Sequence, residues 1–593
     1  MPAPAPTFPA LLQRSVERHG DRPLFGVREI EGWDYLSYRA FATKVEACRA
    51  GLAATGVAHG DRVALLGTNS VAWAVTAYAS YALGAALVPV YAALRPEDWQ
   101  FILEDSGAKA LICGSAPLFE RTRPLVERLP DLEVHVGEGL APDHPQAFSQ
   151  LLARGRRSEG SPTPVVSDDV ACFLYTSGTT GEPKGVMLTH RAQCQNVSAV
   201  LHSLPLSAED RALSFLPWAH SFGQTCELHA MIALGASMAI SRGPSHLVDD
   251  LREVRPTALV SVPRIFNRLY DDVHRRLRQR PGVLRRLFAE GRRLAAARRE
   301  GPLSLRDRLS LEAADRAVFA PIRARFGGRL RYVFSGGAPL GNETRTLIDD
   351  LGIRVYEGYG LTEAGPVVTA NRPEARRLGS VGRPLLGVSV RIDDERGPPG
   401  TGEICVKSPG VMRGYHRREA ESAAAFDADG WLRTGDVGYL DEDGYLHLTG
   451  RLTEQYKLDS GLFVAPVPLE EELKRSAFIK NIMMYGEGRP HNVALVVVDL
   501  DALNRWAEQR ELHFDSTATM LASRRVHDLV LAEIGERSRS HQAYERIKDV
   551  HLTDVDFTTD NGMLTPTGRV RRSNAFAAHA AALAALYPES GPP

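Results

Sequence analysis

The sequence predicts an α/β protein that ends in a small α+β domain. Three observations support this fold class. The first half alternates short apolar runs with segments of helical spacing, the pattern changes after Val388 to short alternating strands with glycine-rich turns, and the region from about Leu452 has an apolar run of its own. A chain of 593 residues is too long for one core, so at least two domains are expected.

The apolar runs of the first half are typical of strands buried on both faces of a sheet, because they are short and often do not alternate. They lie at residues 62–67, 110–114, 170–178, 212–218 and 257–263. We expect helices to follow several of these runs, for instance after Thr189–His190. No internal repeat of 20 to 50 residues is visible.

Residues 71–94 form the most apolar stretch, and their number would suffice to cross a bilayer. However, the stretch is rich in weakly apolar Ala, contains Thr76, Ser80 and Gly84, and is interrupted by Pro89. We therefore favour a buried helix followed by a buried strand over a membrane span.

Residues 271–330 form a basic segment that holds 16 Arg and has helical spacing with Leu on one face. The simpler interpretation is a solvated amphipathic helix pair. The alternative is a surface that contacts anionic lipid or a phosphorylated cosubstrate.

After Val388 the alternating pattern predicts a β-rich subdomain, in which Asp-Glu-Asp-Gly at 441–444 reads as a hairpin turn. Beyond it, the run at 491–500 predicts a small separate core, and the Ala-rich residues 575–587 predict a final helix.

Composition narrows the function. The net charge is −1, from 71 basic and 72 acidic residues, so a general nucleic-acid or membrane-surface binder is not indicated. Six scattered cysteines without a C-x-x-C pair argue against a disulfide framework and a structural zinc site, and no signal-peptide pattern is visible. We expect free thiols and a cytoplasmic protein. Arg outnumbers Lys 63 to 8, so each retained Lys is mildly informative.

The strongest motif is Tyr-Thr-Ser-Gly-Thr-Thr-Gly-Glu-Pro-Lys-Gly at 175–185, between a buried strand and an expected helix. Gly residues let the backbone turn and point its N–H groups inward, hydroxyl side chains add donors, and Lys184 adds a point charge. This chemistry suits a polyphosphate, although the segment is not a Walker A loop. A flexible linker would not follow a buried strand directly or keep one of only eight lysines. The candidate phosphate ligands besides Lys184 are Thr176, Ser177, Gly178, Thr179, Thr180 and Gly181.

This segment resembles the phosphate-loop signature of the adenylate-forming (ANL) superfamily, which comprises acyl-CoA synthetases, luciferases and peptide-synthetase adenylation domains. Further segments match in order from about Phe8 to Tyr587, and the long-chain fatty acyl-CoA synthetase branch, with its Arg-rich helical insert, is the most similar. The resemblance implies an N-terminal domain (1–450) of two stacked α/β subdomains and a β-rich subdomain. It also implies a small mobile α+β C-terminal domain (451–593) with a hinge near 451–454.

Two further segments resemble the family's acid and adenine sites. His220, in Leu-Pro-Trp-Ala-His-Ser-Phe-Gly at 216–223, would by itself be a packed histidine, but the resemblance implies a gate or a neighbour of the substrate carboxylate. The turn at 335–339 resembles the adenine-binding turn, although read alone it also fits a plain strand-to-helix turn. Its candidate ligands are Gly336, Gly337, Ala338 and Pro339.

In the segment Tyr-Glu-Gly-Tyr-Gly-Leu-Thr-Glu at 356–363, the resemblance implies that Tyr359, with its ring face, and Gly360 lie next to the adenine. The resemblance implies that Thr362 contacts the α-phosphate. It also implies that Glu363 and Thr176 bind Mg²⁺, which usually shares its shell with phosphates and water.

Asp436, in Thr-Gly-Asp at 434–436, resembles the ribose ligand, because a carboxylate accepts hydrogen bonds from both ribose hydroxyls. Arg451, fifteen residues further on, resembles the hinge residue that contacts ribose or phosphate.

The C-terminal segment departs from the family. Arg569 stands where a Lys normally bridges carboxylate and phosphate, and Arg keeps the charge but is planar and bulkier. Lys184 and Lys457, by contrast, are retained as lysines. We count Lys457, together with Arg569, as a catalytic candidate. Gly568 replaces a bulky residue, which we expect to loosen the loop. Leu462 and Thr453 also differ from the usual pattern.

These parts imply ATP and Mg²⁺ as cofactors, CoA as cosubstrate and a small acid as substrate, with no nucleic-acid partner. The carboxylate would attack the α-phosphorus of ATP in line and displace pyrophosphate. Three functions stay open: a fatty or aryl acyl-CoA ligase; an adenylating enzyme with another acceptor, such as a carrier protein or, as in ATP-dependent diazotases, an aryl amine with nitrite; and a weakly active nucleotide-binding homologue. The acid, the acceptor and the oligomeric state are not determined by the sequence.

Overall fold

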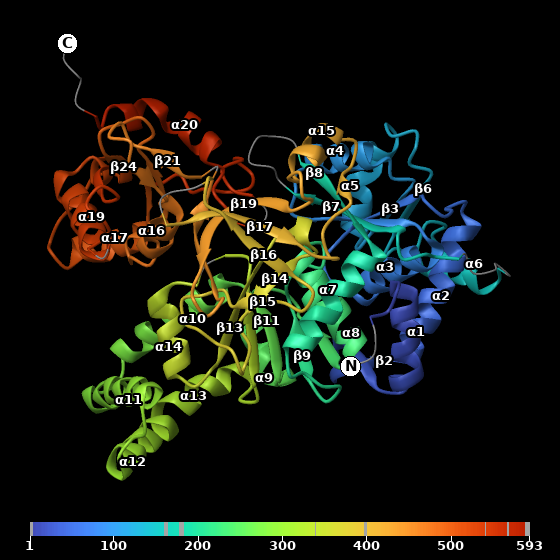
Figure 1. Ribbon diagram of the computed structural model, residues 1–593, viewed down its shortest axis with the longest axis horizontal. Helices are drawn as coiled ribbons and strands as arrows, with labels where there is room; N and C mark the ends of the chain where they lie inside the picture. The colour runs from blue at the N-terminus through green and yellow to red at the C-terminus, as the bar shows by residue number, and fades with distance from the viewer. Residues whose placement is uncertain are drawn as a thin grey trace.

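The computed structural model describes residues 4–158, 164–176, 183–338, 340–396, 400–452, 454–539, 541–565 and 568–587. Two large sheets and a four-stranded sheet make up the chain as far as Arg451, and a three-stranded sheet with its helices follows (Figure 1). The expectation of an α/β architecture with a β-rich part and a small C-terminal α+β part is confirmed.

The seven-stranded sheet occupies the right side of Figure 1. Five of its strands are parallel, and β8 and β18 extend it in antiparallel fashion. In sheet order the strands are β18 (Gly414–Tyr415), β8 (Lys184–Thr189), β7 (Val170–Thr176), β4 (Ala86–Val90), β3 (Arg62–Leu66), β5 (Ala110–Cys113) and β6 (Val134–Gly137). The associated helices are α2 (Tyr38–Ala54), α3 (Val71–Leu83), α4 (Pro96–Ser106), α5 (Ala116–Val126) and α6 (Phe148–Arg156).

The nine-stranded sheet lies at the centre, with six parallel strands and antiparallel strands at both edges. Its order is β15 (Arg383–Pro384), β14 (Val367–Ala370), β13 (Val355–Gly360), β12 (Tyr332–Ser335), β11 (Ala258–Ser261), β9 (Arg211–Ser214), β10 (Ser237–Ile240), β1 (Pro23–Glu29) and β2 (Gly32–Ser37). Its helices include α1 (Phe8–His19), α7 (His190–Ser203), the π-helix η1 (Gly223–His229), α8 (Ala230–Leu234), α9 (Leu247–Val254) and α14 (Asn342–Asp350).

The Arg-rich segment is helical, as expected. It forms α10 (Pro263–Arg278), α11 (Gly282–Glu300), α12 (Leu305–Ala314), the short π-helix η2 (Asp315–Phe319), α13 (Ala320–Arg323) and η3 (Ala324–Phe326). These helices project from the body at the lower left of Figure 1.

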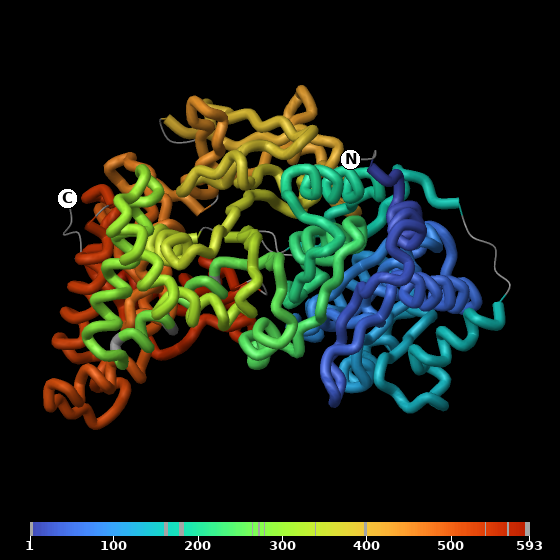
Figure 2. The backbone as a smooth tube through the Cα atoms, turned by 90° about the horizontal axis from the view of Figure 1, so that it is seen from below, coloured from blue at the N-terminus to red at the C-terminus, as the bar shows by residue number. Residues whose placement is uncertain are grey.

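The β-rich subdomain is an antiparallel sheet of β16 (Ser389–Asp393), β17 (Gly402–Lys407), β19 (Leu432–Leu440) and β20 (Leu446–Arg451), with α15 (Glu419–Ala424) before β19. The predicted hairpin turn at 441–444 joins β19 to β20. Figure 2 shows this subdomain at the top, between the two ends of the molecule.

The C-terminal part has its own buried cores, whose members all lie between Tyr456 and Tyr587. All seven residues of β24 (Asn492–Val498) are buried, as the apolar run predicted. The other elements are β21 (Tyr456–Lys457), β22 (Phe463–Val464), α16 (Pro466–Leu473), β23 (Ile479–Tyr485), α17 (Leu500–Glu508), α18 (Thr517–Leu521), α19 (Arg524–Arg537), β25 (Ile547–Thr553) and α20 (Arg572–Ala584).

The apolar stretch at 71–94 folds as predicted, into helix α3 and strand β4. Ser70 accepts a hydrogen bond from the backbone N–H of Trp73 and so caps α3. Eleven of the thirteen residues of α3 are buried, because the helix packs into the core between the two large sheets. In the described part of the chain, no helix is both long enough and apolar enough to span a bilayer.

The helix expected after Thr189–His190 is confirmed as α7, but the sequence did not predict the strand that lies between the phosphate motif and this helix. The chain re-enters the sheet as β8, which pairs with β7 from Val170↔Thr189 to Thr176↔Lys184, and α7 begins only at His190. The segment Lys-Gly-Val-Met-Leu-Thr favours a strand here because it has two ladder partners, β7 and β18. Lys184 is therefore held at the first position of a strand.

Candidate active site

The two ends of the phosphate motif lie in the antiparallel strands β7 and β8, where Thr176 pairs with Lys184. Both side chains are partly buried. The candidate ligands Ser177, Gly178, Thr179, Thr180 and Gly181 lie outside the described residues. The structure thus locates the base of the loop at the edge of the seven-stranded sheet.

Lys184 contacts Tyr415, a residue that the sequence motifs did not indicate. The Lys184 Nζ lies 5.3 Å from the centre of the Tyr415 ring, a cation–π distance. The Tyr415 hydroxyl donates a hydrogen bond to Glu363 Oε1 at 3.1 Å. Burial and the neighbouring Glu363 raise the pKa of Tyr415, so this hydroxyl keeps its proton. Lys184 therefore lies over the Tyr415 ring, and Glu363 lies at its hydroxyl.

Thr362, which directly precedes Glu363 in the chain, contacts the segment that carries His220. The hydroxyls of Thr362 and Ser221 are 3.0 Å apart. The backbone N–H of Phe222 donates to His220 Nδ1 at 3.1 Å, which places the ring proton on Nε2. Burial, and then the charge of Arg569, lower the pKa of His220 to about 4. His220 is therefore neutral at pH 7 and offers the cleft a hydrogen-bond donor without charge.

The turn after β12 forms the next wall of the cleft. Gly336 packs so closely that an added Cβ would lie 3.1 Å from the Phe222 ring. Gly337 and Ala338 are exposed to the cleft, whereas Pro339 lies outside the described residues. A flat ring can approach this backbone without meeting a side chain.

Tyr359, Asp436 and Arg451 form a buried triad. The Tyr359 hydroxyl donates to Asp436 Oδ2 at 2.7 Å, and Arg451 Nε lies 2.5 Å from Asp436 Oδ1. Asp436 and Arg451 are direct partners across β19 and β20, which explains how two residues fifteen positions apart meet. Tyr359 and Asp436 are only 7% and 6% exposed. Gly360, the last residue of β13, follows the triad at the exposed end of its strand.

Arg569 reaches across from the C-terminal domain. Its Nη2 donates to the backbone carbonyl of Gly337 at 3.2 Å. Gly568 N–H donates to the Thr565 carbonyl at 2.8 Å, and its φ of +83° is one that a glycine adopts without strain; the expected loosening of the loop stays a prediction. Arg569 thus lies against the adenine-type turn.

Lys457 is the one described catalytic candidate that the structure does not bring into the cleft. It is exposed, and its Nζ lies 4.5 Å from the centre of the Phe463 ring in the small β21–β22 ribbon.

Glu227 is a buried residue that the sequence motifs did not reveal. Its carboxyl accepts from Ser214 Oγ at 2.5 Å and lies 3.5 Å from the Leu216 backbone N–H. Burial raises its pKa to about 8, so it is mostly protonated at neutral pH. Glu227 belongs to the π-helix η1, and such helices are often found at functional sites. It holds the start of the segment that carries His220.

The two domains also meet at Gly341 and Arg475, away from the triad. The Arg475 side chain, 9% exposed, lies 3.7 Å from Glu343 of α14. A Cβ at Gly341 would overlap the Arg475 guanidinium, the movable end of a long side chain, which would have to shift.

A magnesium ion fits this arrangement. Within the described ranges there is no cluster of three or more His, Cys, Asp or Glu side chains able to hold a metal by themselves. Glu363 instead offers one partly buried carboxylate close to β8, and Thr176 ends β7. Mg²⁺ is typically bound by one or two carboxylates together with substrate phosphates and waters. These donors suit an ion that arrives with a nucleotide.

Comparisons with known proteins agree with this geometry. The family model "AMP-binding enzyme" matches residues 12–416, and the model "AMP-binding enzyme C-terminal domain" matches residues 454–591. The chain is 31% identical over 587 residues to the long-chain-fatty-acid–CoA ligase FadD15 of Mycobacterium tuberculosis, covering 94% of both chains. It is also 31% identical to the peroxisomal long chain acyl-CoA synthetase 6 of Arabidopsis thaliana, covering 94% of this chain and 82% of that protein.

Among solved structures, the adenylation domain of a carboxylate reductase from Mycobacterium chelonae superposes with a TM-score of 0.79 at 25% identity, covering 98% of this chain and 91% of that one. An anthranilate CoA ligase in complex with anthranoyl-AMP gives a TM-score of 0.73 at 21% identity, covering 98% and 99%, which supports the shared fold. The protein therefore belongs to the AMP-binding enzyme family of the adenylate-forming (ANL) superfamily.

Proposed function

We propose that this enzyme is a long-chain fatty acid–CoA ligase that uses ATP, Mg²⁺ and CoA. The acid and ATP form an acyl-adenylate and pyrophosphate, and the acyl group then passes to the CoA thiol with release of AMP. The related ligases and synthetases of this branch support the reaction class. The observation that carries the choice of acid is an uncharged pocket beside the adenine-type turn.

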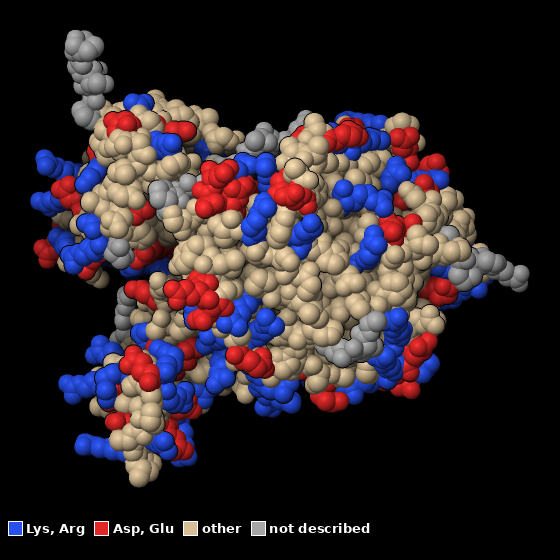
Figure 3. All heavy atoms as spheres, viewed as in Figure 1, with Lys and Arg blue, Asp and Glu red and all other residues tan. Residues whose placement is uncertain are grey.

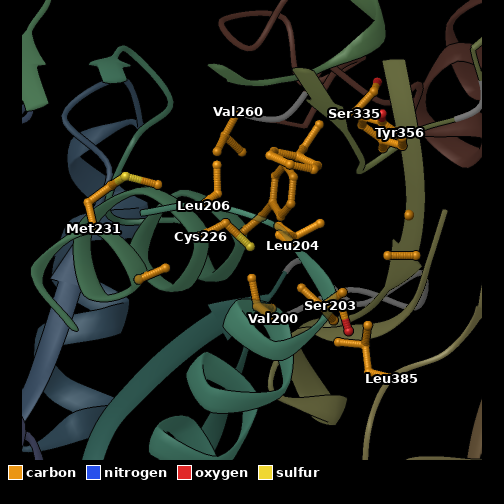
Figure 4. Close-up of a pocket in the computed structure, with 16 residues that line it drawn as sticks. Val200, Ser203, Leu204, Leu206, Cys226, Met231, Val260, Ser335, Tyr356 and Leu385 are labelled. Atoms are coloured by element: carbon orange, nitrogen blue, oxygen red, sulfur yellow. The ribbon is translucent and has the colours of Figure 1, made fainter. Parts of the chain in front are cut away.

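This pocket lies between α7, η1 and α8 on one side and strands β11 to β14 on the other (Figure 4). Its cavity volume is about 40 Å³, so the walls must move apart to admit an alkyl chain. None of the described residues that line it is charged; they are Val200, Ser203, Leu204, Leu206, Phe222, Cys226, Ala230, Met231, Val260, Phe334, Ser335, Tyr356, Gly358, Val367, Ala370 and Leu385. Such a wall favours an alkyl chain over a polar acid.

The pocket adjoins the reacting centre. Ser335 precedes the Gly336–Gly337 turn, and Phe222 follows His220 and Ser221 by one or two positions. An alkyl chain in the pocket therefore places its carboxylate near the Ser221–Thr362 hydroxyl pair. Each buried methylene contributes about 0.8 kcal/mol, about a fourfold gain in affinity.

In the proposed mechanism, the adenine lies on the turn at 336–338, the ribose hydroxyls donate to Asp436, and the triphosphate lies in the β7–β8 hairpin against Lys184. Bound Mg²⁺, held by Glu363 and Thr176, would supply charge neutralisation to the phosphates. One carboxylate oxygen attacks the α-phosphorus; the new O–P bond forms as the bond to the leaving pyrophosphate breaks. Arg569 and Lys184 offset the negative charge, and Thr362 orients the α-phosphate.

We further propose that the C-terminal domain rotates after this step to admit CoA, which would bring Lys457 or its neighbours toward the cleft. The contact of Arg569 with Gly337 supports an arrangement suited to the adenylation step.

The six cysteines of the chain are free and buried, which supports the proposed reducing, cytoplasmic setting.

A second candidate keeps the adenylation step but changes the acceptor to a carrier protein or an aryl amine. The observation that favours it is Arg569, where the resemblance leads us to expect Lys. The likeness to a carboxylate reductase adenylation domain supports the shared first step.

The decisive experiment measures pyrophosphate release with ATP, Mg²⁺ and a series of acids from butyrate to stearate, with benzoate and nitrite as comparisons. We expect kcat/KM to rise about fourfold per methylene until the pocket is filled, and CoA to be consumed as AMP forms. A flat chain-length series would contradict the fatty-acid assignment. AMP formation with nitrite and an aryl amine, without CoA consumption, would replace the ligase by the second candidate.

A further inference from the structure

The charges of this chain are strongly segregated. Residues 271–330 contain sixteen Arg and seven acidic residues, a net charge of +9, whereas the whole chain has −1 and the remainder therefore −10. The positive charge lies on the projecting helices at the lower left of Figure 1. A molecule with this charge distribution turns its helical projection toward a negative surface.

Some of these arginines have structural roles. Arg292 and Arg299 form ion pairs with Asp350 of α14, and Arg323 pairs with Asp315. The first two pairs attach the projection to the body, and the third lies within the projection. Their charges are thus already partnered.

Five further arginines are exposed and form no ion pair or side-chain hydrogen bond with a residue that the structure describes. Arg280 lies just before α11, Arg285 and Arg286 lie near the start of α11, and Arg306 and Arg308 lie at the start of α12. Exposed cations without partners in the fold are available to an external anionic surface.

Large apolar side chains are exposed beside these arginines. Leu305 and Leu309 of α12 are 80% and 66% exposed, and Val283 of α11 is 74% exposed. Leu305 and Leu309 are one turn apart and share a face, while Leu311 and Ala314 of the same helix are buried. At about 100° per residue, Arg306 and Arg308 lie about 80° to either side of the Leu305–Leu309 stripe. Figure 3 shows basic side chains, with some acidic ones among them, along the edges of an uncharged strip on this projection.

We propose that the α11–α12 projection docks on an anionic lipid bilayer, with Leu305 and Leu309 in the interface and the flanking arginines against lipid phosphates. Apolar side chains between cations are the pattern of a helix that lies in a membrane interface. Nucleic acid would gain nothing from exposed leucines, and Phe288, the one aromatic residue between Arg280 and Arg316, is buried and offers no stacking surface. In a consequence that rests on the proposed function, docking brings the enzyme to acids dissolved in the bilayer.

The test is flotation of the full-length enzyme with vesicles of phosphatidylcholine alone or with roughly 30% phosphatidylglycerol. We expect binding to the anionic vesicles, little binding to the neutral ones, and loss of binding as salt rises from about 0.1 M to about 0.5 M. Replacing both arginines in Arg306→Gln/Arg308→Gln should weaken binding about 25-fold, at about fivefold per charge. Leu305→Gln/Leu309→Gln should weaken binding to anionic vesicles and leave a salt-sensitive remainder.

Matched controls make the same changes elsewhere. Arg156→Gln/Arg157→Gln removes two exposed charges at α6, at the other end of the molecule, and Ile30→Gln removes an apolar side chain that is 99% exposed. Both should bind vesicles like the unmodified enzyme. Circular dichroism and thermal melting show that each variant is folded, without any measure of catalysis, so failure of this proposal is separable from failure of the proposed function.

A probe at the surface tests insertion directly. All six natural cysteines are buried, so Leu309→Cys provides one accessible thiol for an environment-sensitive fluorophore. We expect a blue shift with anionic vesicles for Leu309→Cys and none for Ile30→Cys. Unchanged vesicle binding in the Arg306/Arg308 variant, no blue shift at position 309 during binding, or tighter binding to RNA or CoA than to vesicles would each overturn the proposal.

Discussion

Replacing Asp436 by Asn tests the ribose assignment most sharply. The carboxylate is almost fully buried and has two partners, Tyr359 and Arg451. Asn keeps one carbonyl oxygen, replaces the second acceptor by an NH₂ group and removes the charge that faces Arg451. The proposed ribose diol then loses one hydrogen bond to a charged acceptor, a loss of about 2 kcal/mol. The KM for ATP should rise about 30-fold.

The same change also affects stability. Breaking a buried ion pair costs about 3–5 kcal/mol, but the Arg451 side chain is 27% exposed and partly solvated. We therefore expect the free energy of unfolding to fall by about 2 kcal/mol. Urea unfolding measures this change, and pyrophosphate release at saturating acid measures the KM for ATP.

Asp441→Asn is the matched control. Asp441 lies in the turn of the same β19–β20 hairpin and pairs with Arg377 and His447, outside the cleft. This variant should lose stability but keep the KM for ATP within about twofold, because it touches no proposed ligand contact. If Asp436→Asn leaves the KM for ATP unchanged, or if both variants raise it equally, the ribose assignment is wrong.

Four further results are expected. Lys184→Ala should slow pyrophosphate release by about 10² to 10³; a loss below tenfold in single-turnover assays would contradict its phosphate role. Arg569→Lys keeps the charge but loses the fork that reaches the Gly337 carbonyl, so adenylation should slow about tenfold; a faster rate would instead mean that Lys is the better residue there. The Glu227 carboxyl has a pKa raised to about 8, so wild type should lose stability as pH rises from 4.5 through 8, and Glu227→Gln should lose less in pH-dependent urea unfolding; equal losses would refute the assignment. Burial lowers the pKa of His229 to about 3, so the unfolded chain binds more protons than the folded one as pH falls from 6.5 toward 3, and the stability declines. His229→Gln should flatten this decline in thermal melts. A steeper decline in the variant would contradict the assignment.

Much of the fold was predictable because its signals are local. The interrupted apolar stretch at 71–94 gave a helix and a strand, and the acidic turn at 441–444 gave a hairpin. The strand β8 was missed because its stability comes from ladders with β7 and β18, the second of which is more than two hundred residues away in sequence. A segment of six residues carries too little periodicity to reveal such partners.

In the site, too, residues in local motifs were predictable, whereas residues whose roles depend on distant partners were not. Lys184, Thr362, Glu363, Asp436 and Arg451 were predictable because they belong to motifs. Tyr415 was not, because its role follows from a hydrogen bond to Glu363, 52 residues away. Glu227 was also missed, because a single acidic residue in an apolar helix has no signal of its own. Its significance appears only when burial and its partner Ser214 are known.

The close approach of Arg475 to Gly341 has a consequence for how turnover can be adjusted. If the C-terminal domain rotates as proposed, this seam must part and re-form in every cycle, so its tightness sets how long each half of the reaction lasts. Neither residue touches the triad of Tyr359, Asp436 and Arg451. A side chain at position 341 would displace the Arg475 guanidinium and so change how readily this seam re-forms, without a contact to the triad.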